Sequence, residues 1–555
     1  MPVPTVITDL STTPASNYPA GTDSPSTLDD VQRTHASFIR QLYNGDTGLY
    51  TPAGTGAVAT TVQAKLRESV SVKDFGAKGD GVTDDTAAIQ AAITSVRSVG
   101  GRVVVPQGTY LISNSLNMGD ETATYGSFEF VGQGAPVIKS NNLAAPIIKI
   151  GGLLMRLEGL NLQYTSQPTS AQTNAVAIRT YNLAYSVIQS IYIYQVRNGI
   201  DQYQGVVAGT GTNACFSNTI SDIVIQRYTG YGVIMIPTSG GNSGSVWSNI
   251  YINYNINGIP SGSGVTLGAF WLQTAQNEVI DLLNLEWQRN PGPLLVLNQC
   301  GNTSVRGLHI EGVYPTGAYE PLISVLGGDG SCPTFDGITV TGCDWTGLGG
   351  ANLGALFRLN GASPAKITVL GVQSTNNTNP TYMSAVNYGG TTAYGSTIEF
   401  VSVYDVDNSL STSGVPRVAF GTPTASVQYP LLRWNNQSTY YAVDWTPIVT
   451  ASSGTITTVG AVSGKIVKSG QLVTVSFSAT ITTNGTGAGQ VVLSGLPYTC
   501  TVAGFGTGRE NGITGNQLLN FIVSGETKIL VTNYSSTYPG ANGAVIAGQI
   551  TYIAS

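Results

Sequence analysis

Two glutamates, Glu286 and Glu311, are the strongest candidates for chemistry in this sequence. They close the short segments "LLNLE" and "GLHIE" and lie 25 residues apart. If these segments are neighbouring parallel strands, the carboxyl groups are separated by roughly 4.8 Å. Retaining glycosidases hold their two carboxyl groups about 5–5.5 Å apart, whereas inverting enzymes need about 6.5–9.5 Å. One glutamate would act as general acid and the other as base or nucleophile, and His309 on the same face is a third catalytic candidate.

Two aspartates are second-choice catalytic residues. Asp344 follows on the next repeat, and Asp281 precedes Glu286 in the same segment. Asp281 also lies 25 residues before Arg306, and Asp336 follows after another 30, a spacing that predicts a structural ladder of ion pairs. A glutamate in a repeat often only bonds a turn, so a structural role is the open alternative for the glutamate pair as well.

Aromatic, amide and basic side chains near these carboxylates are candidates for contacting a saccharide. Aromatic rings stack on apolar ligand faces, and basic groups neutralise carboxylates. The plain alternative for the aromatic residues is packing or a subunit contact. The substrate-binding candidates are Arg306, Arg289, Asn284, Tyr251, Trp287 and Trp345.

Short apolar-x-apolar segments recur along the chain. Their starts are 25 to 33 residues apart, and turns rich in Gly and Asn lie between them. Such imperfect repeats indicate a solenoid, in which each coil buries its apolar face against its neighbours. The segments are "GLNL" at 159, "SIYI" at 190, "DIVI" at 222, "NIYI" at 249, "LLNL" at 282, "GLHI" at 307, "GITV" at 337 and "KITV" at 366.

Alternate residues of these segments point outward and align into columns from coil to coil. The first outward column is Asn161, Tyr192, Val224, Tyr251, Asn284, His309, Thr339 and Thr368. The second is Gln163, Tyr194, Gln226, Asn253, Glu286, Glu311, Thr341 and Leu370. Carboxylates occupy the second column on two adjacent coils and nowhere else, which singles out the glutamate pair.

The composition favours extended β-structure and narrows the classes of partner. Only 10% of the 555 residues are charged, against roughly 25% in ordinary globular domains, and 69 are glycine. The net charge is -6 without a basic run, which argues against nucleic acid, and no apolar run is long enough for a membrane helix. The five cysteines form no C-x-x-C pair and are expected as buried thiols, with no zinc site and no disulfide framework. We also expect no metal and no cofactor.

The segment "VKDFGAKGDGVTDDTAAIQAAI" has two possible roles: it binds a ligand, or it builds part of the fold. A strand-like start, a Gly-rich turn and a helix capped by Thr83, Asp84 and Asp85 are expected. Such a turn can bind phosphate, but the G-K-[ST] ending is missing and the aspartates would repel an anion. We therefore expect a building role. Upstream, residues 27–43 predict a short neck helix with heptad-like spacing that includes His35.

Two stretches resemble known phage proteins. "SVSVKDFGAKGDGVTDDTAAIQAAI" with "GGRVVVPQGTYLIS" resembles the first coils of pectate-lyase-like right-handed β-helices, especially bacteriophage tailspikes that act as capsular polysaccharide depolymerases. "WTP…GKIVKSGQLVTVSFSATI…GLPY" resembles C-terminal modules of phage tail fibres and tailspikes. The resemblance implies an all-β fold with a short N-terminal helical neck, a right-handed parallel β-helix and a C-terminal β-sandwich, assembled as a homotrimer.

Four regions are expected along the chain. Residues 1–65 form the virion-attachment and neck segment, and residues 66–425 form the β-helix with the catalytic or receptor groove. Residues 426–442 are a linker, and residues 443–555 form the β-sandwich for trimerisation or glycan binding.

The resemblance also implies a function. A tailspike is made in the host cytoplasm without an export signal, joins the virion tail or baseplate through its N-terminus, and acts outside the cell on capsule or O-antigen polysaccharide. Hydrolysis by the glutamate pair is the first expectation. A lyase acting on a uronate-containing glycan, with Arg289 and Arg306 neutralising the carboxylate, is one alternative. A non-catalytic adhesin of the tail is the other.

Overall fold

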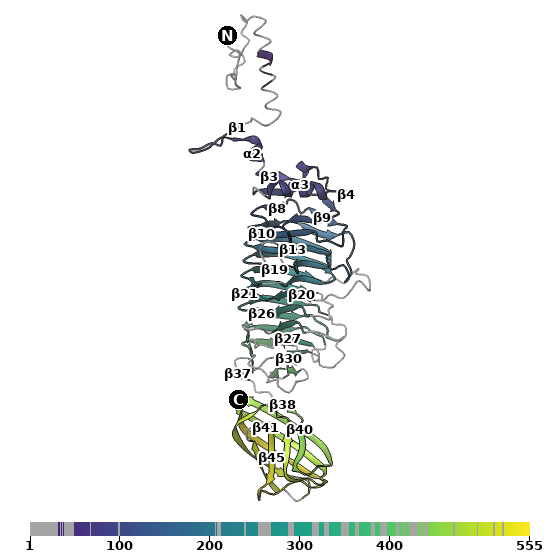
Figure 1. Cartoon of the computed structure of the whole chain (residues 1–555), viewed down its shortest axis with the longest axis vertical. Coiled ribbons are helices and arrows are strands. Elements are labelled where there is room, and N and C mark those ends of the chain that lie inside the picture. The colour runs from purple at the N-terminus through teal and green to yellow at the C-terminus, as the bar shows by residue number, and fades with distance from the viewer. Residues whose placement is uncertain are drawn as a thin grey trace. The chain divides into compact units, whose positions relative to one another are not determined.

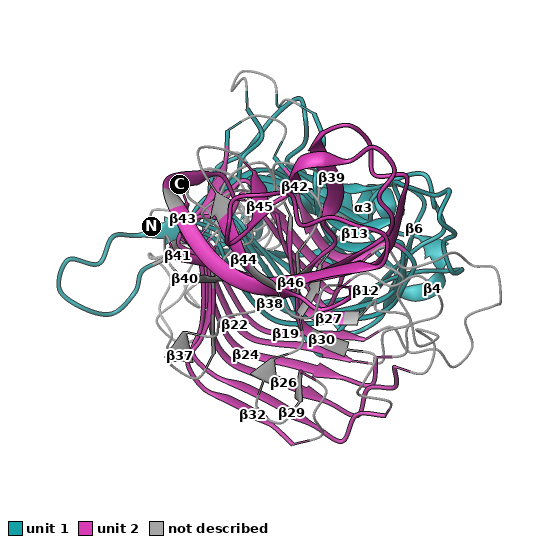
Figure 2. Ribbon diagram, turned by 90° about the horizontal axis from the view of Figure 1, so that it is seen from below, with its two compact units in different colours: residues 1–229, 237–240, 259–264 teal, residues 230–236, 241–258, 265–555 magenta. Residues whose placement is uncertain are grey.

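The computed structural model shows an almost entirely β-stranded chain (Figure 1). The chain divides into two compact units, coloured separately in Figure 2. Unit 1 comprises residues 1–229, 237–240 and 259–264, and unit 2 comprises residues 230–236, 241–258 and 265–555. The residues that the structure describes are 31–33, 35, 37, 49–66, 68–97, 100–205, 207, 212–237, 240–253, 268–286, 293–313, 321–326, 332–345, 354–360, 366–378, 383–388, 397–406, 410–412, 415–416, 418–420, 431–434, 437–438, 442–469, 472–496, 498–513, 517–523 and 527–554.

Unit 1 holds the described helices and the first coils of the solenoid. Its elements are β1 (Leu49–Tyr50), β2 (Thr60–Thr61), α2 (Val62–Leu66), β3 (Ser69–Ser71), the 3-10 helix η3 (Val72–Phe75), β4 (Asp80–Asp84), α3 (Thr86–Val96), β5 (Arg102–Val105), β6 (Thr109–Ile112), β7 (Leu116–Met118), β8 (Glu129–Gly132), β9 (Val137–Ser140), β10 (Ile148–Leu153), β11 (Arg156–Glu158), β12 (Asn161–Tyr164), β13 (Val176–Ala184), β14 (Val187–Val196), β15 (Asn198–Gln202) and β16 (Thr219–Tyr228). Of the predicted neck helix, the described residues 31–33, 35 and 37 are helical.

Parallel ladders stack these coils on two faces. On one face, β7, β10, β13 and β15 pair in that order. On the other, β8 pairs with β11 and β9 with β12, and both β11 and β12 then pair with β14. Each coil thus contributes to two sheets, as a parallel β-helix requires.

Unit 2 continues the same pattern. Its solenoid elements are β17 (Tyr231–Met235), β18 (Asn242–Ser243), β19 (Val246–Asn253), β20 (Gly268–Gln273), β21 (Ala275–Gln276), β22 (Val279–Glu286), β23 (Leu295–Asn298), β24 (Ser304–Glu311), β25 (Ile323–Leu326), β26 (Thr334–Thr341), β27 (Gly354–Asn360), β28 (Lys366–Val369), β29 (Val372–Thr375), β30 (Met383–Tyr388), β31 (Thr397–Phe400), β32 (Val403–Asp405), β33 (Ser411–Thr412), β34 (Val415–Pro416), β35 (Val418–Phe420), β36 (Leu431–Trp434) and β37 (Gln437–Ser438). One parallel ladder runs β17, β20, β23, β25, β27, β30 and β35, and another runs β19, β22, β24 and β26.

The C-terminal part of unit 2 is an antiparallel sheet that closes over its own apolar core. Its strands are β38 (Ala442–Trp445), β39 (Ile448–Ser453), β40 (Thr458–Ser469), β41 (Leu472–Thr483), β42 (Ala488–Ser494), β43 (Cys500–Glu510), β44 (Gln517–Val523), β45 (Lys528–Asn533) and β46 (Ala544–Ala554). The ladder order is β38-β40-β41-β46-β43-β44-β45-β42-β39, so both layers of the predicted β-sandwich belong to one hydrogen-bonded sheet. Alternate residues of β41, including Val475 and Phe477, pack inward with Phe521 of β44 and Val531 of β45.

These ladders confirm the predicted fold class: an all-β chain with a right-handed parallel β-helix and a C-terminal β-sandwich. The boundaries predicted near residues 65, 425 and 442 remain predictions, as does the trimer. The described cysteines are free thiols, four buried and Cys332 half-exposed. Within the described part of the chain, no helix has the length and apolarity to cross a membrane.

A bend in the left-handed region of backbone space sets the phase of each long strand. One residue after this corner the side chain is buried, as at Leu283 and Leu308, and two residues after it the side chain faces outward. The first letter of most of the repeated segments is this corner residue. The corners and their φ angles are Gly159 (73°), Ser190 (56°), Asp222 (56°), Asn249 (52°), Leu282 (54°), Gly307 (62°) and Gly337 (73°).

The predicted columns fail on the coil that contains "KITV". Gln373, and not Thr368, is the register partner of Thr339 in the first column. Leu370 leaves the second column in the same way, and Thr375 takes its place. The segment forms β28, which pairs with the first half of β26, ahead of the corner.

The position of the corner explains the error. In this coil Gly371 lies against the corner residue Gly337. A Cβ placed on Gly371 would be 3.8 Å from the Gly337 nitrogen. The equivalent segment is therefore "GVQS", and the predicted alignment was shifted by five residues.

The Gly/Asp-rich segment is held together by its own carboxylates. Asp80, Asp84 and Asp85 each accept hydrogen bonds from backbone N–H groups nearby. The prediction that Asp85 caps the helix through its side chain is wrong. Its carboxylate is buried and turns back to accept from Lys78 N at 2.6 Å and Gly79 N at 3.0 Å. Closing the turn in this way agrees with a building role.

Glu278 is a buried carboxyl group in unit 2, just before β22. Its oxygens accept hydrogen bonds from the Trp247 indole N–H at 3.0 Å and from Ser245 N at 3.3 Å. Burial raises the pKa of Glu278 to about 7, although both hydrogen bonds oppose the shift. The folded protein therefore holds a proton on Glu278 at a pH where the unfolded chain has lost it.

We expect this group to make the fold less stable as the pH rises. The pKa of Glu278 is near 7 in the folded protein instead of 4.5. The free energy of unfolding therefore falls by about 3 kcal/mol in total as the pH rises through that interval. Glu278→Gln should remove this loss while keeping an acceptor for Trp247. Denaturant melts at pH 5 and pH 8 test it, with the exposed Glu68→Gln as the matched control. An E278Q variant that stays as pH-sensitive as the parent would contradict the assignment.

Leu282 is a second position where a substitution should change stability. It occupies a left-handed corner at φ 54° with its side chain 60% exposed, between Asn249 and Gly307 in the corner column. A side chain other than Gly, Asn or Asp costs roughly 1–2 kcal/mol in this region.

Leu282→Asn should therefore raise the free energy of unfolding by about 1 kcal/mol, because Asn tolerates the corner and little burial is lost. Leu282→Ala keeps the strain and serves as the control. Equal melting temperatures for the Asn and Ala variants would show that the corner is not strained.

Candidate functional site

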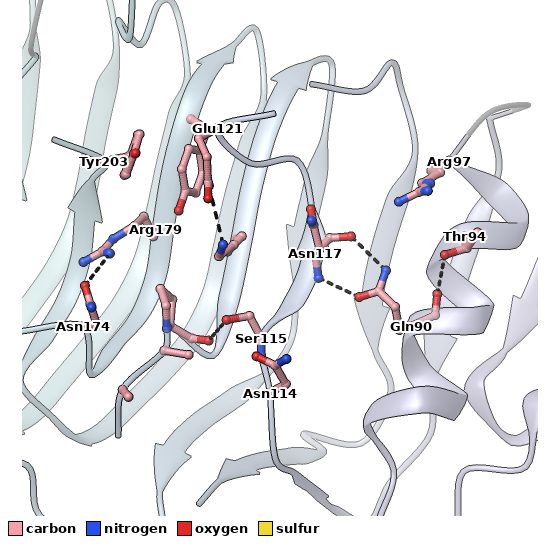
Figure 3. Close-up of a pocket in the computed structure, with 15 residues that line it drawn as sticks. Gln90, Thr94, Arg97, Asn114, Ser115, Asn117, Glu121, Asn174, Arg179 and Tyr203 are labelled. Atoms are coloured by element: carbon pink, nitrogen blue, oxygen red, sulfur yellow. Dashed lines mark hydrogen bonds and ion pairs between the residues drawn. The ribbon is translucent and has the colours of Figure 1, made fainter. Parts of the chain in front are cut away.

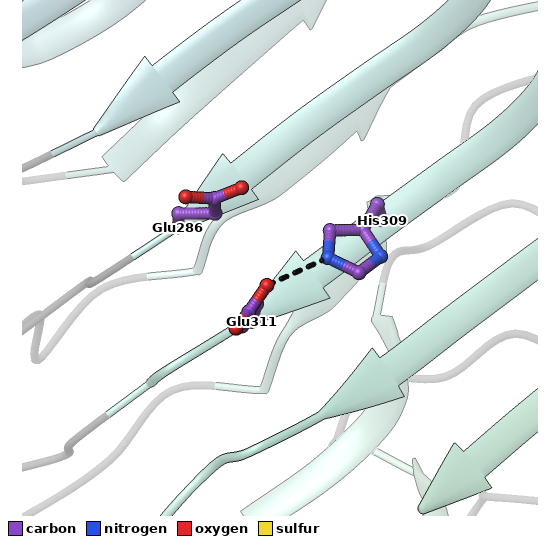
Figure 4. Close-up of side chains that lie close together, drawn as sticks. All are labelled: Glu286, His309 and Glu311. Atoms are coloured by element: carbon purple, nitrogen blue, oxygen red, sulfur yellow. Dashed lines mark hydrogen bonds and ion pairs between the residues drawn. The ribbon is translucent and has the colours of Figure 1, made fainter.

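The two candidate glutamates are the last residues of adjacent strands. Glu286 ends β22 and Glu311 ends β24, each four residues after the corner of its coil. The register pairs Glu286 with Glu311 and Asn284 with His309, as the columns predict. Figure 4 shows both carboxylates and the imidazole together at the ends of the two arrows. The corner thus delivers all four side chains to one outward surface.

The three ionisable groups lie within reach of one another. One ligand atom each from Glu286, His309 and Glu311 lies within 4.8 Å of the other two. His309 Nε2 is 3.1 Å from Glu311 Oε2, and all three residues are half-buried. These carboxylate oxygens thus lie slightly closer together than the roughly 5–5.5 Å of a retaining pair and well below the roughly 6.5–9.5 Å of an inverting pair.

Tyr251 holds Glu286 from the preceding coil. Its hydroxyl donates a 2.6 Å hydrogen bond to Glu286 Oε2 and accepts one of 2.8 Å from Asn253 Nδ2. Burial, the hydrogen bond to Glu286 and the charges of Glu286 and Glu311 raise the pKa of Tyr251. The phenol therefore stays protonated at neutral pH and serves as a hydrogen-bond donor to Glu286.

Asn284 sits between Tyr251 and His309 in the first outward column. Its Oδ1 is buried, and among the described residues no group donates a hydrogen bond to it. An acceptor left in this state costs about 1–3 kcal/mol. A donor hydroxyl or an ordered water entering the site would relieve that cost.

The second-choice carboxylates are not brought to this cluster. Asp281 lies before the corner of its coil and forms a 3.5 Å ion pair with Arg306, both groups being about half exposed. This pairing is the first step of the predicted ion ladder. Asp336 is the register partner of Arg306 on the next coil, but these two described residues form no ion pair. Asp344 pairs by an isolated bridge with Thr378.

The aromatic and basic candidates have different fates. Trp345 is fully buried, so its ring offers no face to a saccharide, which corrects its predicted role. Its side chain packs inside the coil because it follows the outward position of Asp344. Tyr251 contacts Glu286 as a hydrogen-bond donor instead of standing as an open platform. Trp287 and Arg289 lie outside the described residues.

Sequence reasoning missed Asn253 and the donor role of Tyr251. Both precede Glu286 by one coil, and Asn253 is its register partner in the second column. The column alignment contained this information, but the selection rested on charge and therefore passed over an amide and a phenol.

The cluster of Glu286, His309 and Glu311 could in principle hold a metal ion. Two carboxylate oxygens and an imidazole nitrogen suit a zinc-type centre more than calcium, which prefers six to eight oxygens. The hydrogen bond from Tyr251 already occupies one oxygen of Glu286. We therefore expect these groups to act without a metal.

Melting curves after treatment with EDTA test this expectation. Adding millimolar Zn²⁺ or Ca²⁺ should leave the melting temperature unchanged, because only a metal that binds the folded state raises it. A rise in the parent protein that Glu311→Gln abolishes would show that the cluster is a metal site. His309→Asn, which keeps the strand position, gives the second readout of the same ligand set.

Comparison with known proteins finds one family that matches part of this chain and curated relatives that match shorter stretches of it. Residues 69–280 match a family described as "Rhamnogalacturonase A/epimerase, pectate lyase-like". The matched region ends before Glu286 and contains Tyr251 and Asn253. The resemblance to pectate-lyase-like β-helices expected from the first coils is confirmed.

Curated relatives are similar over short stretches. "Alginate lyase 7" of Azotobacter vinelandii is 50% identical over 72 residues, which is 13% of this chain and 7% of that protein. The "Pre-neck appendage protein" of Bacillus phage phi29 is 30% identical over 184 residues, 29% of this chain and 20% of that protein. The chain thus spans a fifth or less of the length of these relatives.

Among solved structures, the Dettilon tailspike protein gp208 is similar over 89% of this chain and 96% of that one. The sequence identity is 13% and the TM-score 0.39.

Proposed function

We propose that this chain is a phage tailspike subunit that binds and depolymerises a bacterial surface polysaccharide, capsule or O-antigen, by glycosidic hydrolysis. The proposal rests on Glu286 and Glu311, whose carboxylate oxygens approach within 4.8 Å on consecutive coils. The pectate-lyase-like family match and the relative named as an alginate lyase support a polysaccharide substrate. The relative named as a phage pre-neck appendage supports a place on the virion tail.

The hydrogen bonds support a division of roles between the two glutamates. Glu286 accepts a hydrogen bond from the Tyr251 hydroxyl, which fixes the carboxylate in place, and we assign it as the nucleophile. Glu311 is the general acid, and His309 is a positioning residue that holds its carboxyl at 3.1 Å. Asn284 offers its free acceptor to a sugar hydroxyl.

Hydrolysis then runs in two steps. Glu286 attacks the anomeric carbon while Glu311 gives its proton to the glycosidic oxygen, so the carbon–oxygen bond to the leaving sugar breaks as the ester forms. Glu311 next takes a proton from water, whose oxygen attacks the same carbon and releases Glu286. Two inversions give net retention of the anomeric configuration.

A lyase acting on a uronate-containing glycan is the second candidate, favoured by the likeness to a protein named as an alginate lyase. Elimination leaves an unsaturated uronate at the new end, whereas hydrolysis leaves an ordinary reducing end. The homotrimer and attachment to the tail through residues 1–65 complete the proposal. Virion assembly and action outside the host cell follow from it.

Replacing either glutamate by glutamine should lower turnover by roughly 10²–10⁴-fold, because general acid–base groups contribute about this much. Glutamine keeps the shape, so glycan binding and melting temperature should stay close to the parent values. Combining Glu286→Gln with Glu311→Gln should be little worse than the poorer single variant, since the groups act as a unit. Asp336→Asn, an exposed carboxylate on the next coil, is the matched control.

The products formed from host polysaccharide decide between the candidates. New reducing ends that disappear in both glutamine variants support hydrolysis by this pair. Unsaturated uronates at the new ends would show that the protein cleaves by elimination and not by hydrolysis. Binding without cleavage by the parent protein would reduce the function to that of a non-catalytic adhesin.

A further inference from the structure

Unit 1 contains a polar pocket that the proposed chemistry does not use. It lies over β7, β10 and β13, beside α3, and has a volume of about 650 Å³. Figure 3 shows side chains from these elements converging on it. Saccharide-sized ligands occupy pockets of roughly 300–1,000 Å³. The candidate glutamates belong to β22 and β24 and do not line it.

Basic groups dominate the charge of this pocket. Arg97, Lys149 and Arg179 line it together with one carboxylate, Glu121. Lys149 and Arg179 are register partners on adjacent strands, so their backbones are about 4.8 Å apart. Like charges in such a position repel, and a fold that keeps them gains when an anion binds between them.

Arg179 is fixed in place and still has hydrogen bonds to give. Its Nε and Nη2 donate to the two oxygens of Asp201, both at 2.8 Å, and its Nη1 donates to Asn174 at 2.9 Å. A guanidinium carries five N–H groups, so two remain uncommitted to described residues. Because the side chain is only 14% exposed, little conformational freedom is left to lose on binding.

Lys149 and Arg97 are less committed. Lys149 Nζ is 3.5 Å from Glu121 Oε2, a long contact on a partly exposed surface. The Arg97 guanidinium lies 4.5 Å from the centre of the Tyr125 ring, and no carboxylate among the described residues pairs with it. Both cations can therefore turn to an incoming anion at small cost.

The walls of the pocket are held by hydrogen bonds between successive elements. Gln90 of α3 donates to Asn117 O at 3.1 Å and accepts from Asn117 N at 2.7 Å. The Ser115 hydroxyl donates to Pro146 O at 2.6 Å. Half-buried Tyr203 lies 4.9 Å from the buried Tyr181 ring and gives the pocket an aromatic edge.

We propose that this pocket binds a carboxylate-bearing sugar residue of the polysaccharide. The planar guanidinium of Arg179 with two spare donors matches a carboxylate, the other two cations add charge, and Tyr203 offers a ring to the sugar. This inference rests on the proposed function for its saccharide ligand and deepens it, because it makes the polysaccharide acidic.

Binding of a galacturonate dimer to the full chain tests the proposal. Titration calorimetry should detect the dimer, and the neutral galactose dimer of the same linkage should bind at least roughly tenfold more weakly, since one charged hydrogen bond is worth about 1.5–3 kcal/mol. Arg97→Gln and Lys149→Gln should each weaken binding by about tenfold. Arg179 is left intact because its removal would strand the buried Asp201.

Lys139→Gln is the matched control, since it removes a half-buried cation of unit 1 from β9, outside the pocket. It should bind like the parent. Equal affinity for the acidic and neutral dimers overturns the proposal. So does equal loss in the Lys139 and Lys149 variants, and so does inorganic phosphate that binds as tightly as the dimer, which would indicate a general anion site.

The dimer is titrated into the Glu286→Gln/Glu311→Gln variant as well, so that binding and cleavage are read separately. If the double variant still binds the dimer, the proposal for the pocket is supported. If the double variant no longer binds it, the dimer binds at the glutamates and the proposal is overturned. If the parent protein binds the dimer but cleaves no polysaccharide, the pocket stands and hydrolysis fails. If it cleaves host polysaccharide but shows no binding sensitive to Arg97 and Lys149, hydrolysis stands and the pocket fails.

Discussion

The left-handed corner that recurs from Gly159 to Gly337 is the constraint on which these coils of the solenoid depend. A strand has a side-chain period of two, so a slip of one residue would exchange the buried and outward faces. The corner fixes where the following strand begins, and so keeps the buried and outward faces in place from one coil to the next. Leu283 and Leu285 are consequently buried, and Asn284 and Glu286 face outward, in the coil that begins at Leu282. The core and the candidate site are two outcomes of one backbone feature.

Stacked columns also bring side chains of like charge together. In two such pairs, a residue from an adjacent strand binds one member by a hydrogen bond or an ion pair. On β22 and β24, Glu286 stands beside Glu311, and Tyr251 donates a hydrogen bond to the first. On β10 and β13, Lys149 stands beside Arg179, and Asp201 from the next strand pairs with the second. A ligand of opposite charge, or a neutral polar ligand, binds favourably at such a place because the charged groups are already in position.

The sequence predicted those features that follow from the spacing of the repeats. It did not predict those that depend on where a strand lies relative to the corner of its coil. The repeat of apolar-x-apolar segments predicted the solenoid and the pairing of Glu286 with Glu311, because both follow from spacing alone. The shift at "KITV" arose because apolar pattern cannot distinguish the strand before a corner from the strand after it. The burial of Trp345 was missed because alternation restarts beyond the end of β26.

The contacts made by side chains were harder to predict. The carboxylate of Asp85 turns toward Lys78 and Gly79 instead of the helix that follows it, and both choices are compatible with its place in the sequence. The pocket over β7, β10 and β13 was not predicted either, since its basic residues are scattered between positions 97 and 179. Only the pairing of β10 with β13 makes Lys149 and Arg179 neighbours.

Coil length varies without disturbing the outward columns, which has a consequence for how such a chain can diverge. An insertion between a strand end and the next corner lengthens a surface loop and leaves every facing residue where it was. An insertion of one residue between Gly307 and Glu311 would instead turn that carboxylate into the core. Evolution can therefore alter the size and sequence of the loops around this surface. Of the four positions after each corner, the two outward ones accept substitution, whereas their number has to stay the same.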